Sequence, residues 1–374
     1  MIRKADCPLY RKLRKFWSSD EQSLKQSNES GRSQRPVMSM KRSEFRARLN
    51  RYVNGAIFST SDQVRSLLSD TWSFRAHAAQ ICEDYRVLEP ALPTLPAEEV
   101  VIPPYKYRDV RIEDLRGTLE KEFRRDIDGI VLHGSFGSGE PVAYSDFDGL
   151  ILLNDEVFQD APRLADLAAR LHRLRSPMLQ IDPLQHHGWF VLTSSDLRQY
   201  PESFLPVEVL KNACSIYGYK DMRLSISRLE HDPLDQGFRR MADTLSGKIR
   251  TGRVPANFYQ AKVFMSEVML LPALYVQARD QKGIFKRESF AAARADFSPS
   301  VWSIMDEYSA YRANWNFQPR GFDKWMLSKS SWLWLHWRKS RGTPLSREVK
   351  ALFEQGKLQA LETLITEMRR RIGK

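Results

Sequence analysis

Two aspartates separated by a single residue are the clearest candidates for chemistry in this sequence. Asp146 and Asp148 flank Phe147 and precede the apolar run at residues 150–153. If this segment is a β-strand, side chains two positions apart point to the same face, so both carboxylates project together. Hard carboxylate oxygens are the ligands that Mg²⁺ prefers. The spacing therefore predicts a magnesium site beside this strand.

A glycine–serine pair upstream is a candidate phosphate-binding turn. The apolar residues 130–132 predict a strand that runs into Gly134 and Ser135. A residue without a β-carbon lets the backbone approach a ligand closely, and the hydroxyl that follows can bond a phosphate oxygen. A helix beginning at this point would add the positive end of its dipole. We therefore expect this turn to bind the phosphates of a nucleotide.

The order of these features resembles the signature of the DNA polymerase β-like nucleotidyltransferase superfamily. That signature is an apolar strand, Gly followed by Gly or Ser, a spacer, and Asp-hydrophobic-Asp or Glu before a second apolar strand. Residues 133–135 and 146–148 supply these elements here, and Gly149 departs from the hydrophobic preference. The resemblance covers about 110 residues, and its motif does not identify the substrate.

The resemblance implies a third carboxylate on a later strand, beside the first two. Asp182, which ends the apolar run MLQID, is the candidate. Because Pro183 cannot donate to a β-ladder, Asp182 should lie at the end of a strand or on an edge strand. His186 and His187 lie nearby and could contact substrate, take a proton or simply line a hairpin, and we favour the structural role.

The resemblance also implies a reaction. A hydroxyl attacks the α-phosphorus of a nucleoside triphosphate, pyrophosphate leaves, and two Mg²⁺ ions stabilise the developing charge. Asp146 and Asp148 would hold one ion, and Asp182 would join them in holding the other or would receive the proton. Ser135 and the neighbouring amides would bind the β- and γ-phosphates.

The pattern of the chain predicts an α+β, α/β-like fold: a mixed nucleotidyltransferase sheet with flanking helices, followed by an all-helical C-terminal domain. Helices are expected over 111–126 and 161–176, and strands over 127–135 and 147–154. Residues 178–184 and 187–193 are expected to form a hairpin, and 213–219 a last short strand. Four segments follow from this pattern: a basic arm at 1–42, a helical lead-in and proline-rich connector at 43–108, the nucleotidyltransferase core at 109–230, and the helical domain at 231–374.

The helical part resembles that of aminoglycoside-modifying relatives, in which a lysine touches phosphate. No motif identifies that lysine here. Lys262 lies on a long expected helix, and Lys286, which follows a glycine-containing turn, is our candidate for nucleotide binding. A group of tryptophans could be a platform for a base, an amphipathic membrane contact, part of the core or a dimer face, and the last two are favoured: Trp325, Trp332, Trp334 and Trp337.

Composition limits the class of protein. Of the net charge of +12, residues 1–50 account for +8, with 13 Lys/Arg against 5 Asp/Glu. This basic arm could bind RNA, but a solvated extension is the favoured interpretation. The three widely spaced cysteines fit a reducing compartment, and no apolar stretch approaches the length of a membrane span. We therefore expect a cytoplasmic protein, with a homodimer left open.

These features favour an enzyme that transfers a nucleotide to a hydroxyl of a small molecule or a protein. Transfer to RNA or tRNA, in the manner of toxin-like members or terminal transferases, is the closest alternative. A cyclic-dinucleotide or oligonucleotide synthase fits less well, because the Gly-Thr expected after Gly-Ser is missing. A catalytically inactive nucleotide-binding partner module would require a lost carboxylate, and Asp146 and Asp148 are intact.

Overall fold

A four-stranded mixed sheet forms the centre of the N-terminal part in the computed structural model, which describes residues 41–55, 72–88, 95–218, 220–229 and 232–373. The strand order is β4–β3–β2–β5, with bounds Phe190–Thr193, Asp148–Leu153, Ile127–His133 and Cys214–Ser215. β2 is antiparallel to β3 and to β5, whereas β3 and β4 are parallel. The basic arm expected at 1–42 lies almost wholly outside the described residues.

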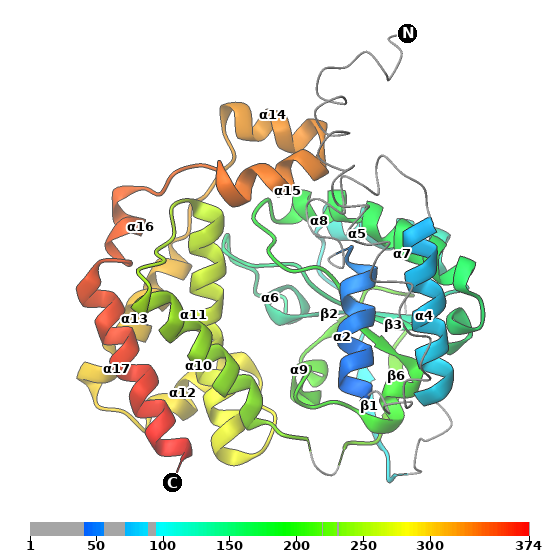
Figure 1. The fold of residues 1–374 in the computed structure, drawn as a ribbon, viewed down its shortest axis with the longest axis horizontal. Coiled ribbons are helices and arrows are strands. Elements are labelled where there is room, and N and C mark those ends of the chain that lie inside the picture. The colour runs from blue at the N-terminus through cyan, green and yellow to red at the C-terminus, as the bar shows by residue number, and fades with distance from the viewer. Residues whose placement is uncertain (1–40, 56–71, 89–94, 219, 230–231, 374) are drawn as a thin grey trace, which may run out of the picture. The chain divides into compact units, whose positions relative to one another are not determined.

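Helices pack around this sheet (Figure 1). Of the described helices, those that precede β2 are α2 (Arg42–Val53), α4 (Trp72–Leu88) and α5 (Val110–Phe123). Those that follow β2 in the N-terminal part are α6 (Gly134–Gly137), α7 (Ala161–Arg173), α8 (Arg175–Ile181) and α9 (Val207–Lys211). Two asparagines, in α2 and just after it, bind the outer edge of β4 and the residue before it. The side chain of Asn50 accepts a hydrogen bond from Val191 N, and that of Asn54 accepts one from Trp189 N, both at 2.8 Å. The lead-in helices are therefore packed onto the sheet.

The hairpin expected between 178–184 and 187–193 is not formed, and Asp182 is not on a strand. Residues 175–181 form α8, and Asp182 is its C-cap. Leu179 and Ile181 are two positions apart, as on one face of a strand, and Met178 and Ile181 are three apart, as on one face of a helix, so this short apolar run does not distinguish the two. Parallel pairing of β3 and β4 also requires a crossover, which α7 and α8 supply. Pro183 follows directly after the end of α8, where no helical hydrogen bond is lost.

A second, two-stranded sheet was not expected from the sequence. β1 (Glu98–Ile102) pairs antiparallel with β6 (Met222–Ile226). β1 lies between prolines in the segment that the sequence predicts to be a connector. Its partner strand, β6, is more than a hundred residues away in the chain. Short strands of this kind are stabilised by their partner, so local sequence gives little sign of them.

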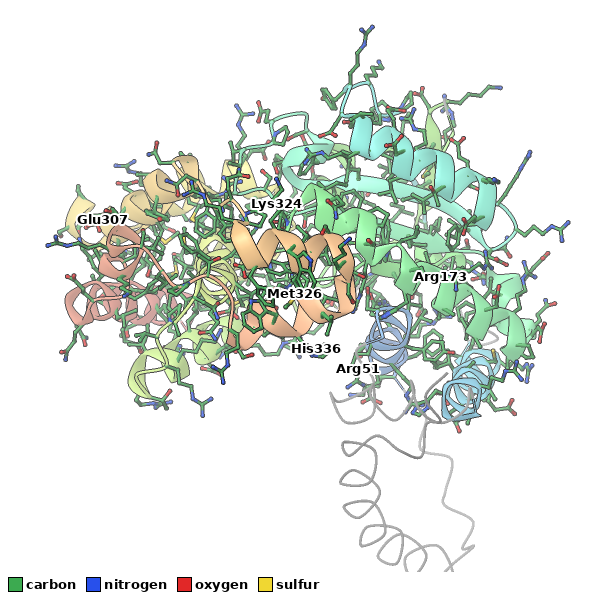
Figure 2. All side chains as sticks on the ribbon, turned by 90° about the horizontal axis from the view of Figure 1, so that it is seen from above. Arg51, Arg173, Glu307, Lys324, Met326 and His336 are labelled. Carbon is green, nitrogen blue, oxygen red and sulfur yellow. The ribbon has the colours of Figure 1, made fainter. Side chains whose placement is uncertain are left out.

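The C-terminal part is entirely helical, which confirms the expected fold class. Its helices are α10 (Asp235–Arg250), α11 (Phe258–Asp280), α12 (Lys286–Arg294), α13 (Pro299–Ala313), α14 (Gly321–Lys329), α15 (Ser331–Ser340), α16 (Arg347–Ala351) and α17 (Gln355–Ile372). The long α11 is the central helix: it packs against α10, α12, α13 and α17. Viewed from above, Figure 2 shows Lys324 and Met326 on α14, which packs beside α15 with His336. In the described part of the chain, no helix is long and apolar enough to cross a membrane.

Candidate active site

The glycine–serine turn and the second aspartate of the pair lie in direct contact. β2 and β3 are paired so that His133 lies opposite Asp148, which places Gly134 next to the carboxylate. Gly134 has φ +63°, in the left-handed region, and a β-carbon built on it would lie 2.3 Å from Asp148 Oδ2. Both the backbone conformation and the contact require glycine. The turn and this carboxylate therefore lie on the same side of the sheet.

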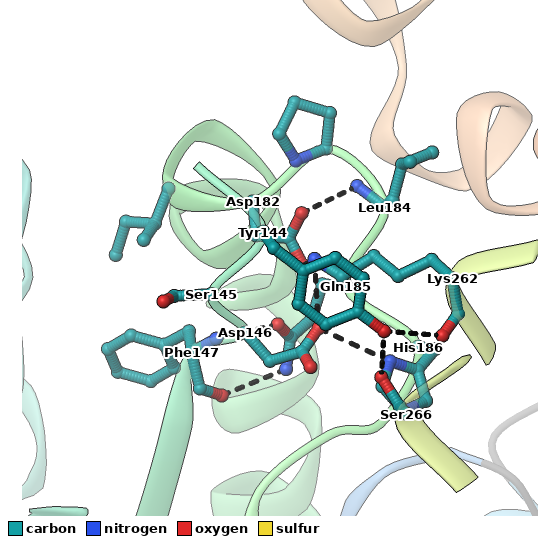
Figure 3. Close-up of polar contacts among 12 residues, drawn as sticks. Tyr144, Ser145, Asp146, Phe147, Asp182, Leu184, Gln185, His186, Lys262 and Ser266 are labelled. Atoms are coloured by element: carbon teal, nitrogen blue, oxygen red, sulfur yellow. Dashed lines mark hydrogen bonds and ion pairs between the residues drawn. The ribbon is translucent and has the colours of Figure 1, made fainter. Parts of the chain in front are cut away.

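Asp146 and Asp182 are brought together by a buried lysine of the helical domain. Lys262 Nζ lies 3.0 Å from Asp146 Oδ1 and 2.8 Å from Asp182 Oδ2, and the Lys262 side chain is 0% exposed. Figure 3 shows the side chains of Asp146, Asp182 and Lys262 converging from three separate segments. Asp182 also ends α8 with a local turn, in which its Oδ1 accepts from Leu184 N at 3.0 Å. The described structure thus gathers the two expected carboxylates around one ammonium group.

The charges of this group shift one another's pKa values. Burial raises the pKa of the Asp146 carboxyl, but the Lys262 ammonium and the nearby imidazoles outweigh burial and hold this pKa well below its usual range. Burial raises the pKa of Asp182 to about 6 despite Lys262, and the negative charge of Asp146 adds to the increase. Burial lowers the pKa of Lys262, but the two carboxylates outweigh it and raise the pKa. Of the two carboxylates, Asp146 is therefore the stronger acid.

Tyr144 fixes the position of Lys262. The Tyr144 hydroxyl donates to the backbone carbonyl of Lys262 at 2.9 Å, and it lies 2.7 Å from Ser266 Oγ one turn further along α11. The Lys262 ammonium lies 5.1 Å from the centre of the Tyr144 ring, a distance at which a cation–π interaction contributes. In the sequence, the sign of this role is a lysine within an otherwise largely apolar stretch of a long helix.

Both histidines face the aspartate pair. His186 Nδ1 lies 3.3 Å from Asp146 Oδ1, and His187 Nε2 lies 3.0 Å from Asp148 Oδ1. Burial lowers the pKa of His187, but the Asp148 carboxylate outweighs burial and raises this pKa to about 9. In Asp148 burial raises the pKa, and the imidazole of His187 outweighs it, so this pKa is lowered. The histidines belong to the carboxylate cluster, although the sequence had favoured a purely structural role.

Two side chains of α15 form hydrogen bonds with the loop that carries these histidines. The Arg338 guanidinium donates to Pro183 O at 2.9 Å and to Gln185 O at 2.5 Å, and the Trp334 indole donates to Pro183 O at 2.7 Å. Trp334 is fully buried, as expected for a core tryptophan, whereas Trp325 is half exposed. The Trp337 indole donates to the Asp323 carboxylate at 2.9 Å. The side chain of Trp332 lies outside the described residues.

The three residues expected to bind the nucleotide line one cavity of about 300 Å³. Gly134 and Ser135 form one side, and Lys286, from the start of α12, lies on the other together with Arg312. Burial lowers the pKa of Lys286, and Arg312 lowers it further. A larger cavity, of about 600 Å³, is lined by Asp182 together with Arg111 and Lys324, among other residues. The carboxylate cluster thus has a small basic cavity near Asp148 and a larger cavity at Asp182.

The donor set fits a divalent metal ion. Asp146, His186 and His187 each offer one ligand atom, and these atoms lie within 4.8 Å of one another. The Asp146 carboxylate contacts the Lys262 ammonium through Oδ1 at 3.0 Å, and the same oxygen lies 3.3 Å from His186 Nδ1. Carboxylate and imidazole groups grouped in this way are common ligands of divalent metal ions.

Comparisons with known proteins give a weak structural similarity. No family model and no curated protein matches the sequence. A spectinomycin adenyltransferase, AAD(9) from Enterococcus faecialis, solved with ATP and spectinomycin, is 11% identical over 71% of this chain and 99% of that chain, with a TM-score of 0.30. A similarity of this size carries no conclusion about this chain, so any function must be supported by the geometry of the site itself.

Proposed function

We propose that this chain is a metal-dependent nucleotidyltransferase, which moves a nucleoside monophosphate from a nucleoside triphosphate to a hydroxyl group and releases pyrophosphate. One observation carries the proposal: Gly134 touches the carboxylate of Asp148 at a cavity that is also lined by Ser135, Lys286 and Arg312. A triphosphate needs positive groups for its oxygens and carboxylates for its metal, and both lie around this cavity.

The residues of the small cavity would bind the triphosphate. Lys286 and Arg312 line the same cavity as Gly134 and Ser135, so a phosphate chain bound there would lie close to two positive side chains and to the turn. Glu140 also lines this cavity, but its carboxylate is paired with Arg287 at 2.8 Å, which offsets its negative charge. The cavity as a whole is therefore suited to an anion.

Asp146 and Asp148 would hold the metal ion, which the resemblance predicts to be Mg²⁺. A bound divalent ion would neutralise charge on the phosphate oxygens and lower the pKa of an attacking hydroxyl. The resemblance implies a second ion next to Asp182, but the Lys262 ammonium lies between Asp146 and Asp182. We therefore assign to Lys262 the second positive charge of the site and expect one ion per chain.

Asp182 is the proposed proton acceptor, because it lines the larger cavity from which an acceptor hydroxyl would approach. A cavity of about 600 Å³ lies within the range of small-molecule sites, which supports a small acceptor. Transfer to RNA is the second candidate. It is supported by Phe322 and Trp325, whose half-exposed rings stack 5.4 Å apart, because exposed aromatic rings suit the stacking of unpaired bases.

A transfer assay with nucleoside triphosphates labelled at the α-phosphate tests the function. The protein is incubated with metal ions and with RNA, protein and metabolite fractions from its source cell. Label in a metabolite or protein supports the first candidate, and label in RNA supports the second. Label in cyclic or linear dinucleotides would identify a synthase instead. Triphosphate binding without transfer to any fraction would contradict the enzymatic proposal and indicate an inactive binding module.

Replacement of Lys286 by methionine is expected to raise the KM for the nucleoside triphosphate roughly tenfold or more. A hydrogen bond to a charged group contributes about 1.5–3 kcal/mol, and methionine retains the length of the side chain without its charge. Steady-state kinetics with varied triphosphate measure this change. Lys282→Met is the matched control, because Lys282 is exposed in the turn before α12. Equal KM values in both variants would remove Lys286 from the site.

A further inference from the structure

Each of the two histidines has one ring nitrogen against one carboxylate of the aspartate pair. His186 Nδ1 lies 3.3 Å from Asp146 Oδ1, and His187 Nε2 lies 3.0 Å from Asp148 Oδ1. Asp146 Oδ1 also contacts the Lys262 ammonium, at 3.0 Å. An imidazole nitrogen and a carboxylate oxygen in this position need a shared proton or a shared cation between them.

Gln185 fixes the loop that carries both rings. Its side-chain amide pairs with the backbone of Phe147, the residue between the two aspartates: Oε1 accepts from Phe147 N and Nε2 donates to Phe147 O, both at 2.9 Å. This reciprocal pair also fixes which end of the amide is nitrogen. The histidine loop is thus attached to the backbone of the carboxylate segment, and the spacing between the two is set by two hydrogen bonds.

The same amide determines which nitrogen of His187 carries a proton in the neutral ring. Gln185 Nε2 has two hydrogens, and the carbonyls of Phe147 and His187 accept them at 2.9 and 3.0 Å. His187 Nδ1 then acts as a donor to Gly188 O at 3.2 Å. The lone pair of the neutral imidazole lies on Nε2, the atom 3.0 Å from Asp148 Oδ1, and a bound metal ion would replace the proton that His187 otherwise shares with this carboxylate. This is the arrangement of a metal-binding histidine, whose second nitrogen donates to a backbone carbonyl.

We infer that His186 and His187 join Asp146 and Asp148 in a mixed carboxylate–imidazole metal site, which takes a first-row transition ion in preference to Mg²⁺. The inference rests on the proposed function and assigns the ion that this site uses. Mg²⁺ prefers oxygen ligands and retains several waters, whereas imidazole suits first-row transition ions. The all-carboxylate site that the resemblance implies has no place for two nitrogen ligands, so the histidines change the selectivity of the site.

Binding of Mn²⁺ to the full chain tests this inference without any turnover. Equilibrium titration followed by electron paramagnetic resonance gives the affinity, and pulsed measurements on the bound ion detect modulation from directly coordinated nitrogen. We expect one Mn²⁺ per chain with nitrogen modulation, and at least tenfold weaker competition by Mg²⁺. His187→Ala is expected to weaken Mn²⁺ binding by at least about tenfold to a hundredfold, because loss of a partner that only orients a metal ligand already has an effect of this size. His186→Ala should act in the same direction.

His77→Ala is the matched control, since His77 is exposed on α4, and it should leave Mn²⁺ affinity unchanged. Absence of nitrogen modulation in the unmodified chain, or displacement of Mn²⁺ by an equal concentration of Mg²⁺, would overturn the inference, even if the histidine variants fail to fold. If Mg²⁺ supports transfer and bound Mn²⁺ shows no nitrogen coordination, the inference is wrong but the proposed function stands. Nitrogen-coordinated Mn²⁺ without any nucleotidyl transfer would support the site and contradict the proposed function.

Discussion

Replacement of Asp148 by asparagine is expected to reduce nucleotidyl transfer about a thousandfold or more while leaving the protein folded. Asparagine has the same shape but lacks the negative charge that would hold the metal against the phosphates, and a loss of about 4 kcal/mol in transition-state stabilisation corresponds to this factor. The asparagine amide can still form a hydrogen bond with His187, whose Nε2 lies 3.0 Å from the carboxylate, because its nitrogen can donate to the lone pair of that atom. Pyrophosphate release and thermal unfolding, measured on the same preparation, separate the two effects.

Asp166→Asn serves as the control for this variant. Asp166 is exposed on α7 and pairs with Arg170 at 2.7 Å, an interaction of a kind that contributes little to stability. Its replacement should change neither the transfer rate nor the unfolding midpoint. If Asp148→Asn retained the transfer rate of the unmodified protein, Asp148 would have no part in catalysis.

Replacement of Gly134 by alanine is expected to lower the transfer rate roughly a hundredfold and to destabilise the fold. The left-handed backbone at φ +63° costs about 1–2 kcal/mol for a residue with a β-carbon. The new methyl group would also lie 2.3 Å from Asp148 Oδ2, so the carboxylate must move away from its metal-binding position. A displacement of about 1 Å in a catalytic group can reduce the rate by this factor. Transfer rates and Mn²⁺ affinity should fall together.

Gly252→Ala isolates the contact from the backbone penalty. Gly252 follows α10 with φ +64°, nearly the same conformation as Gly134, but a β-carbon there would meet no atom within 4 Å. Both variants should lose similar stability through the backbone, and only Gly134→Ala should lose transfer and metal binding. Equal activity of the two variants would show that the turn does not support the position of Asp148.

The part of the site that the sequence predicted is local in the chain. The spacing of Asp146 and Asp148 and the turn at Gly134 lie within one pair of adjacent antiparallel strands, so their proximity follows from strand periodicity and short-range pairing. The core strands, the flanking helices and the helical C-terminal part were predictable for the same reason. Hydrophobic periodicity identifies such elements without knowledge of their partners.

The contacts that complete the cluster depend on distant segments. Lys262 reaches Asp146 and Asp182 from a helix that begins more than seventy residues after the carboxylates, and nothing in its local sequence specifies this partner. Asp182 was identified from the resemblance but assigned to a strand, because the residues before it are apolar in a pattern that fits both structures. β1 and β6 were missed because their pairing is also remote.

The histidines are the most informative difference between sequence and structure. Two adjacent histidines, the first of them four residues after a possible third carboxylate, have no spacing typical of a metal site, so the sequence favours a structural role. Their function depends on Gln185, whose amide attaches the histidine loop to the backbone between the aspartates. A side chain that pairs with backbone at a distance of 38 positions cannot be predicted from periodicity or composition.

A crystal structure with a non-hydrolysable nucleoside triphosphate and Mn²⁺ tests the central claim most directly, because anomalous scattering locates the ion independently of the protein atoms. We expect an anomalous peak in contact with both Asp146 and Asp148, and a triphosphate between the Gly134–Ser135 turn and Lys286. A triphosphate bound elsewhere, or an ion that contacts neither aspartate, would contradict the claim that these residues form one nucleotide-binding metal site.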